Sequence, residues 1–153
     1  EKSGLAKEFI AERGEYTMRG GWLANAFADR SLNGLSVQDY LWTIQRKTII
    51  ELAEEGPCVI VGRCGDYILE GKARLLKVFI HASIESRAKR IVEKYGESSE
   101  APEKRLRDKD VRRSSYYHFY TDVEWGIAKN YDIALDSGTL GIDRCVDIIA
   151  SLY

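Results

Sequence analysis

The chain has 153 residues and a formal net charge of −1 at pH 7; 44% of its residues are hydrophobic and 31% are charged. This length suits one domain with a single substantial core, and the near-neutral charge provides no general attraction to nucleic acid or to a membrane. No apolar run approaches the roughly 18 residues of a membrane helix, and no signal peptide is recognisable. The cysteines are odd in number and lack metal-binding spacing, which disfavours a disulfide framework and a bound zinc ion. We therefore expect a cytoplasmic globular protein without a metal site of its own.

The first third of the chain contains one strong helical pattern. Residues 5–14 predict a short helix, and residues 14–35 are ambiguous because glycine turn signals flank a candidate helix. Ser36 is a good N-cap for a long helix that Gly56-Pro57 stops. Apolar residues recur at helical spacing along this segment: Val37, Tyr40, Leu41, Ile44, Thr48, Ile49, Leu52 and Ala53.

The segment that follows combines an apolar strand with a glycine-flanked arginine. Cys58–Val61 is a short apolar run that Gly62 ends, which is typical of a strand buried on both faces of a parallel sheet. Arg63 follows this strand, at the sheet end where ligands of open parallel sheets bind. A guanidinium there suits a phosphate or carboxylate ligand, and a salt bridge to a neighbouring helix is the alternative. Residues 66–69 are predicted to be helical.

Two further strands, each followed by a helix, are predicted downstream. Ser83 is the expected cap of a helix that ends at Tyr95, and Ile142–Leu152 closes the chain as an amphipathic helix. Strands that alternate with helical segments predict an α/β fold, with a parallel sheet covered on both faces. We expect three strands to lie parallel in one sheet, over residues 58–61, 75–80 and 132–135.

A basic segment followed by aromatic residues is the second strong feature. Six lysines and arginines fall within residues 104–113, interleaved with two aspartates, and the aromatic run 116–120 follows. A solvated, salt-bridged helix is the plain explanation of such a charge run. The adjoining aromatic residues, and the position between two strand units, favour a mobile lid at about residues 97–121. A nucleic-acid patch is the weaker interpretation, since the rest of the chain is not basic.

Several other residues have alternatives that the sequence leaves open. His81 is expected at a strand end and His118 in the aromatic run, both with structural roles. Cys64 could be a reactive thiol, although burial beside a sheet end is the favoured interpretation. Thr139 and Gly141 predict either a helix entry or a loop that contacts a nucleotide base.

This order of segments resembles the C-terminal part of a cytidylate kinase, most closely the bacterial cytidylate-kinase-like proteins. The resemblance covers about residues 36–153 and is specific in order and spacing. It rests on these segments: Gly62-Arg63, Leu76–Ile80, Ala82–Arg90, Arg107–Arg113, Tyr116–Thr121 with Trp125-Gly126, and Tyr131–Leu140.

The resemblance implies a P-loop NTPase fold of the nucleoside monophosphate kinase type, in which a three-layer α/β/α parallel sheet carries a helical lid. Such enzymes transfer the γ-phosphoryl group of ATP to a nucleoside monophosphate with the help of Mg²⁺. ATP and a cytidylate-like monophosphate are the implied partners. The implied substrate-binding residues are Arg63, Asp66 and Arg87, and the implied catalytic residues of the lid are Arg107, Arg112 and Arg113.

The chain departs from the family pattern in two places. The family has an aspartate directly after the motif arginine, where Cys64 stands here, with Asp66 two residues on. No G-x-x-x-x-G-K-[ST] motif occurs in the chain. The family places this loop at its N-terminus, so we expect the loop and first strand to precede residues 1–153, which form one kinase-like domain. The alternative function is a nucleotide-binding regulatory protein of the same fold without turnover.

Overall fold

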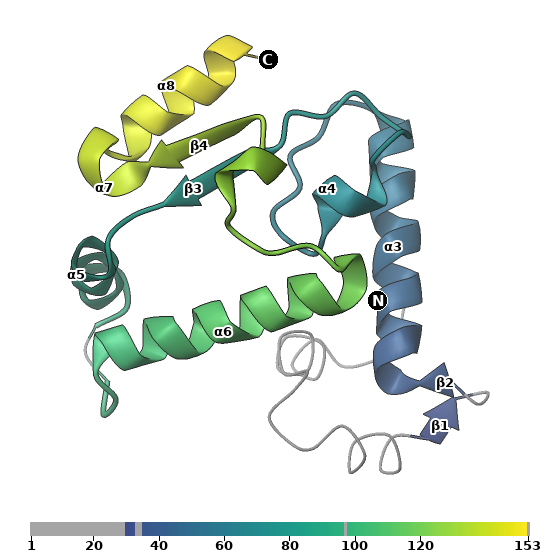
Figure 1. Ribbon diagram of the computed structural model, residues 1–153, viewed down its shortest axis with the longest axis horizontal. Helices are drawn as coiled ribbons and strands as arrows, with labels where there is room; N and C mark the ends of the chain where they lie inside the picture. Colours follow the sequence, from purple (N-terminus) through teal and green to yellow (C-terminus); the bar gives the residue numbers. More distant parts are fainter. Residues whose placement is uncertain (1–29, 33–34, 97, 153) are drawn as a thin grey trace. The chain divides into compact units, whose positions relative to one another are not determined.

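The computed structural model describes residues 30–32, 35–96 and 98–152, which form a mixed α/β structure (Figure 1). The helices predicted within residues 5–14 and 14–35 lie outside the described residues. The chain divides into two compact units. The first contains the described residues up to Leu75 together with Arg112–Val123, and the second contains Leu76–Val111 and the residues from Glu124 onwards.

One long helix dominates the first unit. Helix α3 (Val37–Glu55) begins directly after Ser36 and ends before Gly56, as the start and stop signals predict. A short antiparallel pair of strands, β1 (Arg30–Leu32) and β2 (Leu35–Ser36), precedes it. Helix α4 (Gly65–Ile68) is a single turn, in agreement with the predicted helix after Arg63.

The core of the first unit joins α3 to α4. Ile49 of α3 is buried together with Ile68 and Leu69 at the end of α4. Burial of one such side chain contributes about 1.5–3 kcal/mol to folding. The apolar stripe predicted for α3 is therefore confirmed at Ile49 and also at Leu41, which is buried, whereas Leu52 is exposed.

The second unit contains a parallel two-stranded sheet. Strand β3 (Val78–His81) pairs in parallel with β4 (Ile133–Asp136), and Ile80 lies opposite Leu135. Parallel neighbours need a long crossover connection, which the two helices between them provide. The strands predicted at 75–80 and 132–135 are thus confirmed as parallel neighbours; the first begins at Val78 and ends at His81, and the second is shifted by one residue.

Helices follow both strands, as the alternating pattern predicts (Figure 1). The Ser83 hydroxyl accepts a 3.2 Å hydrogen bond from the Ser86 N–H and so caps the helix after β3. Among the described residues, no helix combines the length and apolarity needed to cross a membrane. The remaining elements are α5 (Ile84–Tyr95), α6 (Pro102–Thr121), a short 3₁₀ helix η1 (Ala128–Asn130), α7 (Ser137–Leu140) and α8 (Ile142–Leu152).

The strand predicted over residues 58–61 is wrong. These residues are not in a strand, and no strand of the described residues pairs with them. Val59 and Val61 are 92% and 87% exposed, so the apolar run is not covered on both faces. An apolar run becomes a strand only where a neighbouring backbone pairs with its N–H and C=O groups. Apolar composition alone did not indicate whether such a neighbour was present.

We predict that the sheet of the second unit depends on Leu135 far more than on its register partner Ile80. Leu135 is 7% exposed and Ile80 is 46% exposed. Leu135→Ala should lower the free energy of unfolding by about 2–4 kcal/mol because it leaves a cavity. Ile80→Ala should cost no more than about half as much. Chemical denaturation of both variants tests this, and equal losses would contradict the assigned burial.

Candidate functional site

A tight loop in the first unit carries Arg63, the predicted substrate-binding arginine. Gly62, Arg63 and Cys64 have φ angles of 67°, 57° and 55°. This left-handed conformation is easy for glycine but costs other residues about 1–2 kcal/mol each. Residues 62–66, here called the Arg63 loop, are therefore strained at two consecutive positions. Backbone strain of this kind clusters at functional sites, which makes the loop a candidate site.

Close packing and backbone hydrogen bonds hold the Arg63 loop in this conformation. The Gly65 N–H donates to the Gly62 carbonyl at 3.1 Å, and the Ile68 N–H donates to the Cys64 carbonyl at 2.9 Å. A Cβ atom on Gly65 would lie 2.9 Å from Cγ2 of Ile60, so glycine is needed at this position. The two flanking glycines have separate roles: Gly62 permits the turn, and Gly65 permits the packing.

Cys64 is buried, as the favoured interpretation of the sequence predicts. Desolvation by burial, followed by the nearby Asp66 carboxylate, raises the pKa of the Cys64 thiol to about 12, against an opposing effect of Arg63. The thiolate is the nucleophilic form of cysteine, and a raised pKa suppresses it at neutral pH. The structure therefore favours a packing role for Cys64 over the reactive-thiol alternative.

Three aromatic side chains, here called the aromatic cluster, pack the C-terminal half of α6 against α3. They are Trp42, Tyr116 and Tyr120. The Trp42 and Tyr120 rings are stacked, with centroids 4.0 Å apart and planes 9° apart. Tyr116 meets Tyr120 edge-on at 4.8 Å, and burial raises the pKa of both hydroxyls. The aromatic run at 116–120 is thus mainly a packing surface within the first unit.

Two neighbouring tyrosines of α6 also contact the Arg63 loop. The Tyr117 hydroxyl donates a 2.7 Å hydrogen bond to Oδ2 of Asp66. A hydrogen bond with Arg63 acts to lower the pKa of Tyr116, against the stronger effect of its burial. The loop therefore presents a cation and a carboxylate, each in contact with a tyrosine of α6.

Two predicted lid arginines belong to the same unit as the Arg63 loop. Arg112 lies one helical turn before Tyr116, and Arg113 lies one turn before Tyr117. Residues at this spacing share a helix face. The first unit therefore contains four of the predicted site residues: Arg63, Asp66, Arg112 and Arg113.

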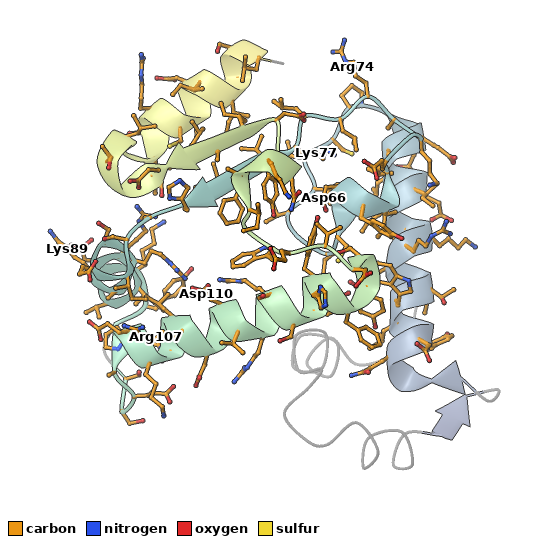
Figure 2. All side chains as sticks on the ribbon, in the orientation of Figure 1. Asp66, Arg74, Lys77, Lys89, Arg107 and Asp110 are labelled. Carbon is orange, nitrogen blue, oxygen red and sulfur yellow. The ribbon has the colours of Figure 1, made fainter. Side chains whose placement is uncertain are left out.

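The other two predicted site residues, Arg87 and Arg107, belong to the second unit. Arg87 of α5 forms a two-pronged ion pair with Asp110 of α6, with Nη1–Oδ2 and Nη2–Oδ1 distances of 2.7 and 2.9 Å. Figure 2 places Asp110 on the side of α6 that faces α5. Arg107 lies one turn before Asp110 and is exposed. Arg87 is thus held by a carboxylate, the salt-bridged arrangement that the sequence left open for Arg63.

Hydrogen bonds tie the carboxyl ends of β3 and β4 to α5. Arg90 donates to the hydroxyl and carbonyl oxygens of Ser137 at 3.3 Å each, and the Ser137 hydroxyl donates to the His81 carbonyl at 3.0 Å. The Thr139 hydroxyl donates to Asp136, and this bond is the main reason why the pKa of Asp136 is lowered. His81 is confirmed at a strand end, and Thr139 fits the helix-entry alternative.

In the part of the chain that the structure describes, no group of three or more His, Cys, Asp or Glu residues could hold a metal ion. A Mg²⁺ ion that accompanies ATP does not require such a group. Magnesium is usually held by one or two carboxylates together with waters and the phosphates of the substrate.

Sequence reasoning missed the partner residues of the site. The sequence identifies Asp110 only as one of two aspartates within the basic segment 104–113. Trp42 lies outside the apolar stripe predicted for α3. Tyr117 was grouped with its aromatic neighbours, although its hydroxyl has a different role. Trp42 could have been found, because a tryptophan is large and hydrophobic and is usually packed against neighbouring side chains. Nothing local indicates that Asp110 pairs with Arg87.

We predict that Arg63→Gly is more stable than Arg63→Ala by about 1 kcal/mol. Both substitutions remove the same side-chain contacts, but only glycine relieves the left-handed strain. Urea denaturation of the two variants measures the difference. Equal stability would show that the backbone at residue 63 is not strained in solution.

We predict that iodoacetamide at pH 8 modifies Cys58 at least about tenfold faster than Cys64. Cys58 is exposed and Cys64 is buried. The pKa of Cys64 is higher in the folded state than in the unfolded state. The contribution of this thiol to the free energy of unfolding is therefore fully present below the unfolded pKa of about 8.5, and it is lost as the pH rises towards 12. Mass spectrometry of digested samples measures the two rates. Equal rates in the folded protein would contradict the burial of Cys64.

Comparisons with known proteins agree with this architecture. The model of the cytidylate kinase-like family matches residues 1–139. Among solved structures, the chain is similar to an uncharacterized protein from Eubacterium ventriosum, with a TM-score of 0.69 and 27% identity over 76% of this chain and 73% of that chain. A comparison with curated proteins gave no match. Because the family match extends over most of its length, the chain belongs to the cytidylate kinase-like family.

Proposed function

We propose that this protein transfers the γ-phosphoryl group of ATP to a nucleoside monophosphate, with a cytidylate-like monophosphate as the acceptor. Family membership supports a nucleotide kinase activity in general. The observation that carries the more specific proposal is the strained Arg63 loop, which presents Arg63 and Asp66 within four residues of each other. The proposal includes a three-layer P-loop fold, ATP and Mg²⁺.

The Arg63 loop has the chemistry that an acceptor nucleotide needs. A guanidinium binds phosphate oxygens in a fixed fork, and a carboxylate accepts hydrogen bonds from amino or hydroxyl groups. The Tyr117 hydroxyl uses one acceptor position of Asp66, and a carboxylate offers about four. Because burial of Cys64 and the aromatic cluster fix the loop, less entropy is lost when a ligand binds.

The remaining arginines have the chemistry that phosphoryl transfer requires. This reaction needs little covalent help from the protein, and depends on in-line positioning and on neutralisation of phosphate oxygens. ATP with Mg²⁺, when bound, supplies the phosphoryl group and part of that neutralisation. We assign Arg87 to substrate binding and give the catalytic role of charge neutralisation to Arg107, Arg112 and Arg113. A lid at about residues 97–121 would also exclude water that otherwise hydrolyses ATP.

An acceptor panel tests the proposed reaction. The full-length protein is incubated with ATP and Mg²⁺ and with CMP, dCMP, UMP, AMP or GMP, and ADP formation is followed. We expect the fastest turnover with CMP. Turnover with another monophosphate only would overturn the cytidylate assignment. Nucleotide binding without ADP formation would indicate the regulatory alternative, and no binding at all would contradict both.

We predict that Arg63→Ala raises the KM for CMP by about tenfold or more, because a phosphate loses a charge-assisted contact. Its effect on the unfolding midpoint should be small. Arg74→Ala is the matched control, since Arg74 is an exposed arginine of the same unit and points into solvent (Figure 2). A clearly lowered unfolding midpoint with an unchanged KM would show that Arg63 is a structural residue.

A further inference from the structure

The Arg87–Asp110 ion pair differs from the Lys89–Glu93 ion pair on α5. It is two-pronged, and its side chains are only 24% and 27% exposed. The Lys89–Glu93 pair on α5 is 3.8 Å long, and its side chains are 79% and 61% exposed. Exposed pairs of that kind contribute little to stability, whereas a shielded two-pronged pair is stronger and fixes geometry.

The surroundings of this pair favour a fixed geometry. Ala88, the neighbour of Arg87 on α5, is buried, and so is Leu106, one turn before Asp110 on α6. Apolar contacts therefore flank the pair on both helices of the second unit. A guanidinium fixed in this way cannot rotate freely about its last side-chain bonds, so its unused donors have a defined direction.

The atoms that form the pair leave one edge of the guanidinium to other partners. Asp110 accepts hydrogen bonds from Nη1 and Nη2, which together form the end of the guanidinium. An arginine has five N–H donors, and the edge that contains Nε is a second fork with the same spacing. A phosphate can bind at that edge while the aspartate keeps the end.

We propose that Asp110 is a positioning residue, which holds the end of the Arg87 guanidinium and directs its Nε edge toward a phosphate of the bound nucleotide. This inference rests on the proposed function, because it assumes that Arg87 contacts the substrate. Asp110 itself touches no reacting atom in this arrangement. Its carboxylate pairs with the guanidinium at both ends of the fork, so the arginine is already held in place before a nucleotide binds.

Four variants of the full-length protein separate positioning from simple structural support. Asp110→Asn removes the charge of the aspartate, and Asp110→Glu keeps it on a longer side chain. The double variant Arg87→Asp with Asp110→Arg restores an ion pair but moves the cation to α6. Glu93→Gln breaks the exposed Lys89–Glu93 pair and serves as the control. The probe is a bisubstrate analogue that joins cytidine and adenosine through a phosphate chain, and the readouts are its affinity and the unfolding midpoint.

We predict that Asp110→Asn lowers the affinity for the analogue by about tenfold, and that Asp110→Glu recovers part of this loss. Compared with Asp110→Asn, the double variant should regain most of the unfolding midpoint, because it restores an ion pair. Its affinity should stay weak, because the cation now lies on α6. A merely structural pair would recover both values. Glu93→Gln should change neither value. Unchanged affinity in Asp110→Asn, or full affinity in the double variant, would overturn the inference. Failure of the unmodified protein to bind the analogue would instead refute the proposed function.

Discussion

Burial of α4 against α3 is the interaction on which the candidate site depends. Ile68 and Leu69 pack on Ile49, and each buried side chain contributes about 1.5–3 kcal/mol. The left-handed residues Arg63 and Cys64 oppose this by about 1–2 kcal/mol each. The apolar contacts are the larger effect, so the loop remains strained although neither residue favours that conformation. A strained loop that is fixed by its neighbours presents Arg63 and Asp66 in one arrangement.

The two units hold their arginines by different physical means. Around the Arg63 loop, the packing of Ile68 and Leu69 on Ile49, the stacking of Trp42 on Tyr120 and the burial of Cys64 are apolar contacts, which depend little on salt. In the second unit, Arg87 is held by the charge of Asp110. A partly exposed ion pair weakens as ionic strength rises. The geometry of Arg87 should therefore respond to salt.

Local signals were enough to predict α3, α5, α8 and two strands. Ser83 caps α5, and Gly56-Pro57 ends α3, because capping and chain-breaking act within a few residues. The strand at 58–61 was predicted wrongly, since strand formation needs a pairing partner that composition does not specify. Asp110 has its partner 23 residues away on another helix, and no short-range pattern encodes that contact. The order of segments along the chain predicted the family, whereas the contact partners of individual side chains depend on tertiary packing.

The Cys64 departure from the family pattern is best understood through burial. Burial raises the pKa of the Cys64 thiol, and a neutral thiol is only a weak hydrogen-bond acceptor, so it is a poor replacement for a carboxylate. Asp66 is the carboxylate that the Arg63 loop offers instead, and Tyr117 fixes its orientation through a 2.7 Å bond. In the proposed reaction, discrimination among acceptor nucleosides then falls to Asp66. Since Tyr117 belongs to α6, the helix that carries Arg112 and Arg113 also orients the carboxylate that we propose for acceptor binding.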